Sequence, residues 1–315
     1  MKYLTQRAII GEFYRRLAID VGAGWINKVS NYFVATQMTE TYAWLGQVPQ
    51  MREWVGGRLA KQLSEFNFTI TNKHYESTLE FLVIDLLLEK SGQLMIRIGE
   101  QAQRANSHWA QLLSTLIIDA PSTVCYDGQF FFDTDHEEGD SGAQSNDINV
   151  DISELAVLTA GSTTAPAVAE MQGAIVRGIT QIVGFKDDQG EPMNEDAREF
   201  LVMTPMSLYH TALQAVATPA QVAETQTALE AVKKEVRIEV QGNVRLSSWT
   251  ASFAMFRTDS ALKSFIRQEL HGVKMKAKGE GSEFEFDNDA HQYGIDARRN
   301  VGYGMWQNAC LITLT

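Results

Sequence analysis

A single long amphipathic helix, predicted over residues 93–118, constrains the fold of this chain most strongly. Its apolar residues recur every three or four positions and form one continuous stripe. The stripe consists of Leu94, Ile98, Ala102, Ala105, Trp109, Leu112 and Leu116. Charged and polar residues such as Arg97 and Glu100 occupy the opposite face, and Pro121 ends the helix. A helix of this length is typical of a structural spine against which other segments pack.

Residues 64–90 predict a long β-hairpin. Phe66, Phe68 and Ile70 alternate with polar residues at a period of two. Residues 71–73, Thr-Asn-Lys, supply turn chemistry, and residues 78–84 form the second strand. Two strands without a third are marginally stable in water. We therefore expect the hairpin to lie on another surface, and we predict that replacing Phe68 and Phe81 by serine blocks association while the monomer stays folded.

The first 60 residues combine a short amphipathic start with an irregular middle. The N-terminus lacks the apolar core and cleavage site of a signal peptide. Trp44 and Trp54 lie close to Pro49 and three glycines, which argues against a continuous helix. Two tryptophans need a surface to bury them. We expect another part of the fold, or another subunit, to provide it.

The remainder of the chain mixes helices and strands. Helical spacing appears at residues 168–182, and a buried strand at 200–203 is followed by a helix that Thr204-Pro205 opens. A polar helix is predicted at 219–235, strands at 236–246 and 249–256, and mostly strands in the tail. The predicted fold class is α+β.

Composition excludes several classes of protein. The 27 basic and 39 acidic residues give a net charge of −12, which argues against a protein whose main task is to neutralise phosphates. Two cysteines give no disulfide framework, so a reducing, cytoplasmic site of synthesis is the default. No apolar run is long enough to span a bilayer. The sequence contains no P-loop, HExxH or Gly-x-Ser-x-Gly motif.

An acidic run, residues 133–140, is the strongest candidate for chemistry. Asp133, Asp135 and His136 could hold a divalent cation through oxygen and imidazole ligands, as in a metal-dependent hydrolase. The run does not match the calcium-loop pattern. The competing interpretation is a solvated acidic loop after a buried aromatic segment, with residues 127–128 as a turn.

Three stretches together resemble the major head (capsid) subunit of Mu-like tailed bacteriophages. They are WLGQVPQMREWVGGR at 44–58, FTITNKHYESTLEFLVID at 68–85 and CYDGQFFFDTDH at 125–136. The resemblance is close over roughly residues 40–140 and looser elsewhere. It implies the Hong Kong 97-like capsid fold, with an N-terminal arm, an extended hairpin loop, a peripheral domain on a spine helix, and an axial domain. The segment CYDGQFFF is then expected to be a strand that buries its phenylalanines beside the spine helix.

On this resemblance the chain divides into five segments. These are the N-terminal arm (1–60), the extended hairpin loop (61–92), the peripheral domain with its spine helix (93–154), the axial domain (155–265) and the returning strands of the peripheral domain (266–315). The arm and hairpin are expected to lie on neighbouring subunits. The predicted inter-subunit contact residues are Trp44, Trp54, Phe66, Phe68, Ile70, Phe81, Leu86 and Leu87.

The resemblance implies a structural protein that self-assembles into the pentamers and hexamers of an icosahedral head around double-stranded DNA. It implies no catalytic, metal or cofactor site and no membrane. The other partners it implies are scaffold, portal and decoration proteins and packaged DNA, contacted non-specifically. The location implied is the virion, after assembly in the cytoplasm of the bacterial host. Two alternatives stay open: the metal-dependent hydrolase described above, and a ring-forming head-completion or tail protein.

Overall fold

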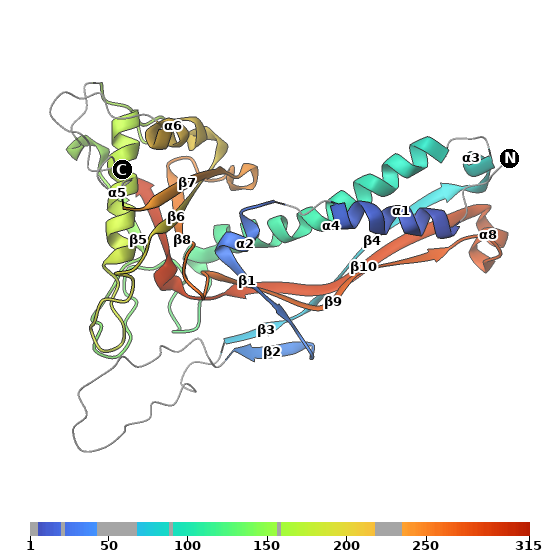
Figure 1. The fold of residues 1–315 in the computed structure, drawn as a ribbon, viewed down its shortest axis with the longest axis horizontal. Helices are drawn as coiled ribbons and strands as arrows, with labels where there is room; N and C mark the ends of the chain where they lie inside the picture. The colour runs from blue at the N-terminus through green and yellow to red at the C-terminus, as the bar shows by residue number, and fades with distance from the viewer. Residues whose placement is uncertain (1–5, 20–22, 43–67, 88–90, 156–158, 218–234) are drawn as a thin grey trace, which may run out of the picture.

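The computed structural model describes residues 6–19, 23–42, 68–87, 91–155, 159–217 and 235–315. Within them the chain forms two parts, an elongated part and a globular part that contains the C-terminus (Figure 1). From here on the elongated part is called the arm, which is not the same as the N-terminal arm expected at residues 1–60. In these described ranges, no helix is both long and apolar enough to cross a membrane.

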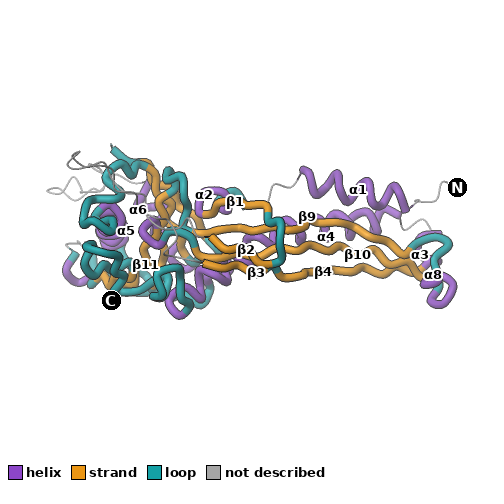
Figure 2. Tube along the Cα trace, turned by 90° about the horizontal axis from the view of Figure 1, so that it is seen from below, coloured by secondary structure: helices purple, strands orange, loops and turns teal. Residues whose placement is uncertain are grey.

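The arm is built on a sheet of long strands. Its order is β1 (Ser30–Val34), β9 (Phe265–Lys278), β10 (Ala290–Tyr303) and β4 (Lys73–Leu82). β10 is antiparallel to both of its neighbours, whereas β1 is parallel to β9. Figure 2 shows β4, β9 and β10 running side by side along the arm. At the far end α8 (Glu283–Asn288) connects β9 to β10, and β4 leads into α3 (Val83–Leu87).

The predicted spine helix is confirmed as α4, Ser91–Asp119, which is about 43 Å long at ~1.5 Å per residue. It lies along the arm together with α1, Gln6–Ile19 (Figure 1). Ile9 and Phe13 of α1 are buried in one cluster with Leu94 and Ile98 of α4. The amphipathic start of the chain is therefore a helix whose apolar side is covered by its own subunit.

The apolar stripe of α4 serves two cores. Leu94, Ile98, Ala102 and Ala105 belong to the arm cluster, which Met275, Tyr293 and Ile295 of the sheet complete. Farther along, Leu113 and Ile117 enter the main core, whereas the predicted Leu112 and Leu116 are only partly buried. The stripe shifts by one residue because the α-helical period of 3.6 is not a whole number of residues.

The globular part contains a second, mixed sheet. Its order is β5 (Asp147–Val150), β11 (Ala309–Leu314), β8 (Ser252–Arg257), β6 (Glu199–Thr204) and β7 (Arg237–Gly242). Around this sheet lie α5 (Val168–Val183) and α6 (Met206–Ala217) (Figure 1). The short elements are α2 (Ile26–Val29) and the 3₁₀ turns η2 (Ala120–Ser122), η3 (Ile152–Glu154), η4 (Val244–Leu246) and η5 (Trp306–Asn308).

Strands from three predicted segments meet in this second sheet. β11 lies between β5 and β8, although the sequence assigned 266–315 to the peripheral domain and 93–154 to the spine-helix segment. The globular part therefore takes strands from outside residues 155–265, and the division into five segments stays a prediction. Sheet pairing joins strands that are far apart in the chain, so local composition does not reveal which strands share a sheet.

The predicted pairing of the 64–90 hairpin is wrong, although both of its strands exist. β3 (Phe68–Thr71) pairs with β2 (Thr39–Tyr42), and β4 pairs with β10. Asn72 between β3 and β4 is buried, and its backbone N–H donates to Met38 O at 2.7 Å. The residues that resemble a hairpin turn thus mark the point where the chain passes from one sheet to the next.

The aromatic segment at residues 125–132 is a turn rather than the expected strand. Cys125 N–H donates to Gln129 O at 2.7 Å, and Gly128 adopts a φ of 89°, which favours glycine. Phe131 and Phe132 are nevertheless buried in the main core, beside the end of α4. Phe132 N–H donates to Ala120 O at 3.2 Å, so the expected position is right for these two residues. Phe130 is 42 % exposed, and the expected backbone conformation is wrong.

Most of the other predicted elements are confirmed: α5, β6, α6, β7 and β8 occur at or within a few residues of their predicted positions. The polar helix predicted at 219–235 lies almost entirely outside the described residues.

Candidate functional site in the loop at 123–146

The acidic run belongs to a loop that is folded back on itself and anchored to the globular part. His136 and Gln144 form an antiparallel bridge, with N–H···O distances of 3.0 and 2.8 Å. Exposure alternates along the run: Asp135 and Glu137 face solvent, whereas His136 and Glu138 are buried. Neither of the two sequence interpretations, a solvated loop or a metal site, anticipates a run whose alternate residues enter the core.

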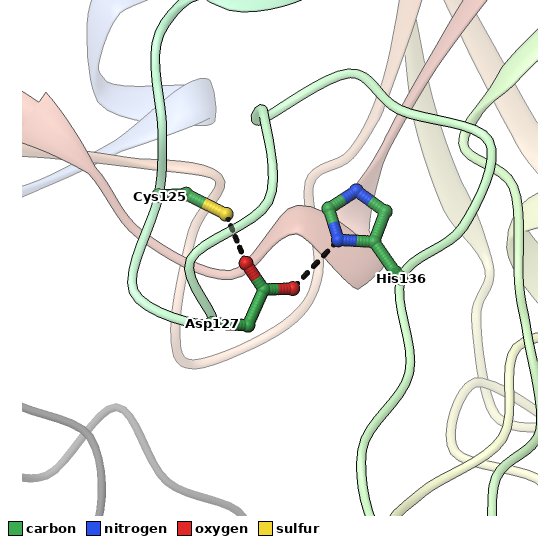
Figure 3. Close-up of side chains that lie close together, drawn as sticks. All are labelled: Cys125, Asp127 and His136. Carbon is green, nitrogen blue, oxygen red and sulfur yellow. Dashed lines mark hydrogen bonds and ion pairs between the residues drawn. The ribbon is translucent and has the colours of Figure 1, made fainter.

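His136 is the centre of a buried hydrogen-bonded cluster (Figure 3). Its Nδ1 lies 2.6 Å from Asp127 Oδ2, and its Nε2 lies 3.2 Å from Asn146 Oδ1. The imidazole stacks on the Trp306 indole, with ring centroids 4.0 Å apart. The other oxygen of Asp127 accepts a hydrogen bond from the Cys125 thiol at 2.9 Å. The cluster therefore ties the 125–129 turn, the acidic run and the C-terminal segment together.

The amide of Asn146 has a defined orientation in this cluster. Its Nδ2 donates to Phe131 O at 2.7 Å, and its Oδ1 accepts from Asp133 N–H at 2.9 Å. Oδ1 therefore faces the ring of His136 as an acceptor. Both imidazole nitrogens face oxygen atoms of the loop, so both take part in hydrogen bonds within it.

Cys125, Asp127 and His136 carry the chemistry of a metal site, because one donor atom of each lies within 4.8 Å of the others. In this arrangement, however, the donors bond to one another. Burial and the charge of Asp127 raise the pKa of the Cys125 thiol far above its ordinary value, which disfavours a thiolate. The three side chains thus form a buried hydrogen-bonded group, which we call the clasp: Asp127 bonds both Cys125 and His136. It is neither an open set of metal ligands nor an activated nucleophile.

The hydrolase alternative requires Asp133, Asp135 and His136 to face one point, and they do not. The Asp133 carboxylate accepts from the backbone N–H groups of Thr134 and Phe130 at 2.7 and 3.1 Å. Asp135 is exposed and hydrogen-bonds to Asp133, which raises the pKa of Asp135. The ring of His136 is turned inward to Asp127 and Asn146. These three residues form no metal-ligand cluster within the described part of the chain.

Glu138 forms a second buried network that sequence reasoning missed. Its Oε1 accepts from Tyr126 OH at 2.6 Å, from Gln307 Nε2 at 3.1 Å and from Trp306 Nε1 at 3.2 Å. Burial raises the pKa of Glu138, and the charge of Asp127 adds to this effect. The sequence carries no signal for it, because residues 135–138 are all polar and show no apolar alternation.

We predict that Glu138→Gln stabilises the subunit at neutral pH and removes a pH dependence. Because the folded-state pKa of Glu138 is raised, ionising this group costs stability as pH rises above about 4.5, and the cost is complete above the folded pKa. Glutamine keeps an acceptor for the three donors without that charge. Melting temperatures at pH 4.5 and pH 7.5 check this: the variant should gain more at pH 7.5. Equal shifts at both values would contradict it.

The predicted inter-subunit contact residues fall into two groups. Trp44, Trp54 and Phe66, together with the side chain of Leu87, lie outside the described residues. The described members are Phe68, Ile70, Phe81 and Leu86, and all four pack within their own chain.

Contacts made by β3 and β4 explain this packing. Ile70 is only 3 % exposed, and Gly302 makes room for it: a Cβ on Gly302 would lie 2.4 Å from Ile70 Cδ1. The Phe81 ring lies 6.1 Å from that of Tyr293 in the arm cluster. These side chains therefore contribute to the stability of their own subunit, in addition to any contact that they make in an assembly.

We therefore expect Phe81→Ser to lower the stability of the monomer, by about 1.5–3 kcal/mol for the lost apolar burial. This replaces the expectation that the monomer is indifferent to changes at Phe68 and Phe81. Urea denaturation of unassembled protein measures it, with Leu82→Ser, at a half-exposed position next along β4, as the matched control. An unchanged denaturation midpoint for Phe81→Ser would show that the packing of Phe81 in the arm does not stabilise the monomer.

Three of the exposed large apolar side chains belong to elements at the far end of the arm. Phe286 of α8 is 91 % exposed, and Leu82 and Ile84 at the neighbouring end of β4 and start of α3 are about half exposed. The sequence contained a signal for α8, because Ser282 and Glu285 match a capping box, and Ser282 Oγ accepts from Glu285 N–H at 3.2 Å. The prediction of mostly strands in the tail is therefore wrong for this segment.

Comparison with known proteins places these features in a family. The model of the Mu-like prophage major head subunit gpT matches residues 11–168 and 226–313, which is most of the chain. The major head subunit of the Mu-like prophage FluMu from Haemophilus influenzae is 32 % identical over 112 residues, 36 % of each chain. The major capsid protein of Escherichia phage Mu is 32 % identical over 110 residues, 35 % of this chain and 36 % of the relative. The alignments thus span about a third of these curated relatives.

The fold is shared with solved phage capsids. The subunit in the procapsid of bacteriophage JBD30 superimposes with a TM-score of 0.55 at 22 % identity, over 98 % of this chain and 74 % of that one. This likeness confirms the predicted α+β, Hong Kong 97-like capsid fold. Together with the family match, it establishes that the chain belongs to the Mu-like prophage major head subunits.

Proposed function

We propose that this chain is the structural subunit of a phage head, which associates with copies of itself into pentamers and hexamers of an icosahedral shell. The observation that carries the proposal is the distal end of the arm, where Phe286 of α8 is 91 % exposed and Leu82 and Ile84, at the end of β4 and the start of α3, are about half exposed. Apolar side chains grouped on an exposed surface mark an interface. Family membership makes a second copy of the chain the partner that this surface fits.

The proposed surface differs from the contact set predicted from the sequence. We define the distal patch as Leu82, Ile84 and Phe286. Phe286 is 91 % exposed within the described chain, so its burial is left to a partner. Four residues of the predicted set remain proposed inter-subunit contacts through the surface area that stays exposed in the subunit: Phe68, Ile70, Phe81 and Leu86.

Within a shell, the other roles of the chain follow as proposals. The subunit encloses double-stranded DNA, and with a net charge of −12 its contact with DNA is non-specific and weak. Scaffold, portal and decoration proteins are the further partners, and assembly takes place in the host cytoplasm before the subunit becomes part of the virion.

Size measurement of the purified chain tests the proposal. Light scattering coupled to gel filtration should detect pentamers, hexamers or shells. A monomer or dimer at every concentration would favour the head-completion or tail alternative. Metal analysis of the same sample tests the hydrolase: a stoichiometric transition metal that Asp133→Asn with His136→Gln removes would support it. Among the described residues the donor atoms that lie close together are those of Cys125, Asp127 and His136, so Asp133 and Asp135 are not part of that group.

A further inference from the structure

The outer face of the arm sheet carries charges of opposite sign on two different strands. Side chains alternate between the faces of a strand, and residues such as Met275 and Leu79 point to the helices and join the arm cluster. On the opposite face β9 presents three exposed lysines at alternate positions: Lys274, Lys276 and Lys278. On the same face β4 presents two exposed glutamates: Glu76 and Glu80. We call these sets the lysine row and the glutamate row.

The strand register places the two rows at the same level along the arm. Asp296 of β10 lies opposite both Lys274 on β9 and Glu76 on β4. Lys278 and Glu80 likewise share one partner residue on β10. The first and last members of each row are four residues apart, which is about 14 Å at ~3.4 Å per residue. The two rows therefore match each other in level and in spacing.

Both rows lie at edges of the sheet, as far as the described strands show. Among these strands β4 pairs only with β10, and β1 reaches only residues 265–269 of β9. Neighbouring strands are about 4.8 Å apart, so β10 keeps the rows about 10 Å from each other. That separation is about the Debye length at 0.1 M salt. Within one subunit the rows therefore attract each other only weakly.

Local hydrogen bonds orient the glutamates without neutralising them. Glu80 accepts from Gln292 Nε2 at 3.0 Å. Glu76 accepts from Thr78 Oγ1 at 2.9 Å, and both donors are uncharged. The middle lysine, Lys276, forms an ion pair with an aspartate of β10 at 3.1 Å. The described residues supply no ion pair for the other two lysines or for either glutamate.

We propose that the two rows join neighbouring copies of the chain, so that the β9 edge of one subunit lies along the β4 edge of the next. A copy placed beside the arm, without a shift along it, brings the lysine row of one subunit level with the glutamate row of the other. Because the rows lie on opposite edges, the contact is heterologous, and such a contact closes into rings. The contact rests on the proposed function, since it requires that copies of the chain associate.

Lysines on an edge strand have a second use in proteins, because they prevent one sheet from pairing with another. In that interpretation the lysine row only repels, and the glutamate row takes no part in assembly. The matched level and spacing of the rows favour attraction between copies. Reversing each row separately distinguishes the two interpretations.

The test uses two variants of the full chain. The lysine variant is Lys274→Glu with Lys278→Glu, and the glutamate variant is Glu76→Lys with Glu80→Lys. In each, like charges face each other, so we expect the assembled fraction to fall about tenfold, with circular dichroism unchanged. Net charge alone would move the two variants in opposite directions, because the first makes the acidic chain more acidic and the second less. A glutamate variant that assembles like the unaltered chain would contradict the proposal.

An equal mixture of the two variants should recover assembly, because acidic rows then face basic rows. Light scattering and electron microscopy should detect rings with an even number of subunits, since only these can alternate the two variants. A mixture that stays unassembled would contradict the proposed contact, and so would a mixture that forms only dimers.

The matched control is Lys186→Glu with Arg245→Glu, at exposed positions outside the arm sheet. It changes the net charge as the lysine variant does, and it should assemble normally. If the lysine variant assembles as well as this control, the contact between the rows is wrong and the proposed function stands. Failure of the unaltered chain to assemble would overturn both.

Discussion

Replacing Phe286 by serine should abolish the formation of closed shells while leaving the subunit folded. This side chain is 91 % exposed, so its removal takes almost nothing from the core. In an assembly, burial of a large apolar side chain contributes ~1.5–3 kcal/mol at each contact. A shell repeats the contact in every subunit, so the loss accumulates until the lattice no longer closes. Circular dichroism and melting temperature should match those of the unaltered chain, and light scattering should detect only small species.

The matched control for this variant is Val244→Ser. Val244 is 70 % exposed, but it lies in η4, away from the distal patch. It should assemble normally, which separates the role of the patch from a general effect of removing exposed apolar area. If Phe286→Ser forms shells as efficiently as the control, the distal patch is not an interface.

Replacing Asp127 by alanine should destabilise the subunit by about 3–5 kcal/mol, the cost of removing one partner of a buried pair. The change takes away the acceptor of both the Cys125 thiol and His136 Nδ1. The neighbouring stack of His136 on Trp306 would loosen as well, because the ring loses the bond that orients it. Urea denaturation of unassembled protein measures the effect.

Asp135→Ala serves as the control for that measurement. Asp135 lies in the same acidic run but faces solvent, so its removal should change stability by less than about 0.5 kcal/mol. Similar losses for the two variants would mean that the run acts as a charged surface rather than through a buried clasp.

The parts of the fold that sequence predicted well are those that local periodicity specifies. α4 and α5 follow from apolar residues at helical spacing, and β6 with α6 follows from a buried run before Thr204-Pro205. Each of these patterns is complete within one segment. The start of α4 differs from the prediction by two residues and its end by one.

Strand partners could not be predicted in the same way. The pattern in β4 correctly indicates a strand, but its partner β10 lies some 200 residues farther along the chain. Nothing in residues 71–73 distinguishes a reversal from a junction between two sheets. The burial of Asn72 decides it, and that burial depends on Met38 and Gln37, which approach only in the folded chain.

The geometry of the 123–146 loop could not be predicted for a related reason. Asp127 before Gly128 fits a turn, and the sequence does not reveal that its carboxylate also bonds His136, nine residues later. Nor could composition place Trp306 and Gln307 beside Glu138, because the C-terminal segment joins the loop only through the globular sheet. The residue types suggested chemistry, whereas the geometry turns them into structural links.

Electron microscopy of the expressed chain tests the central claim, that this protein is a self-assembling head subunit, most directly. We expect closed icosahedral shells, or rings of five and six subunits, with the distal patch of each subunit in contact with another copy. Particles that are only monomers or dimers at every concentration, with α8 free of contacts, would contradict the claim.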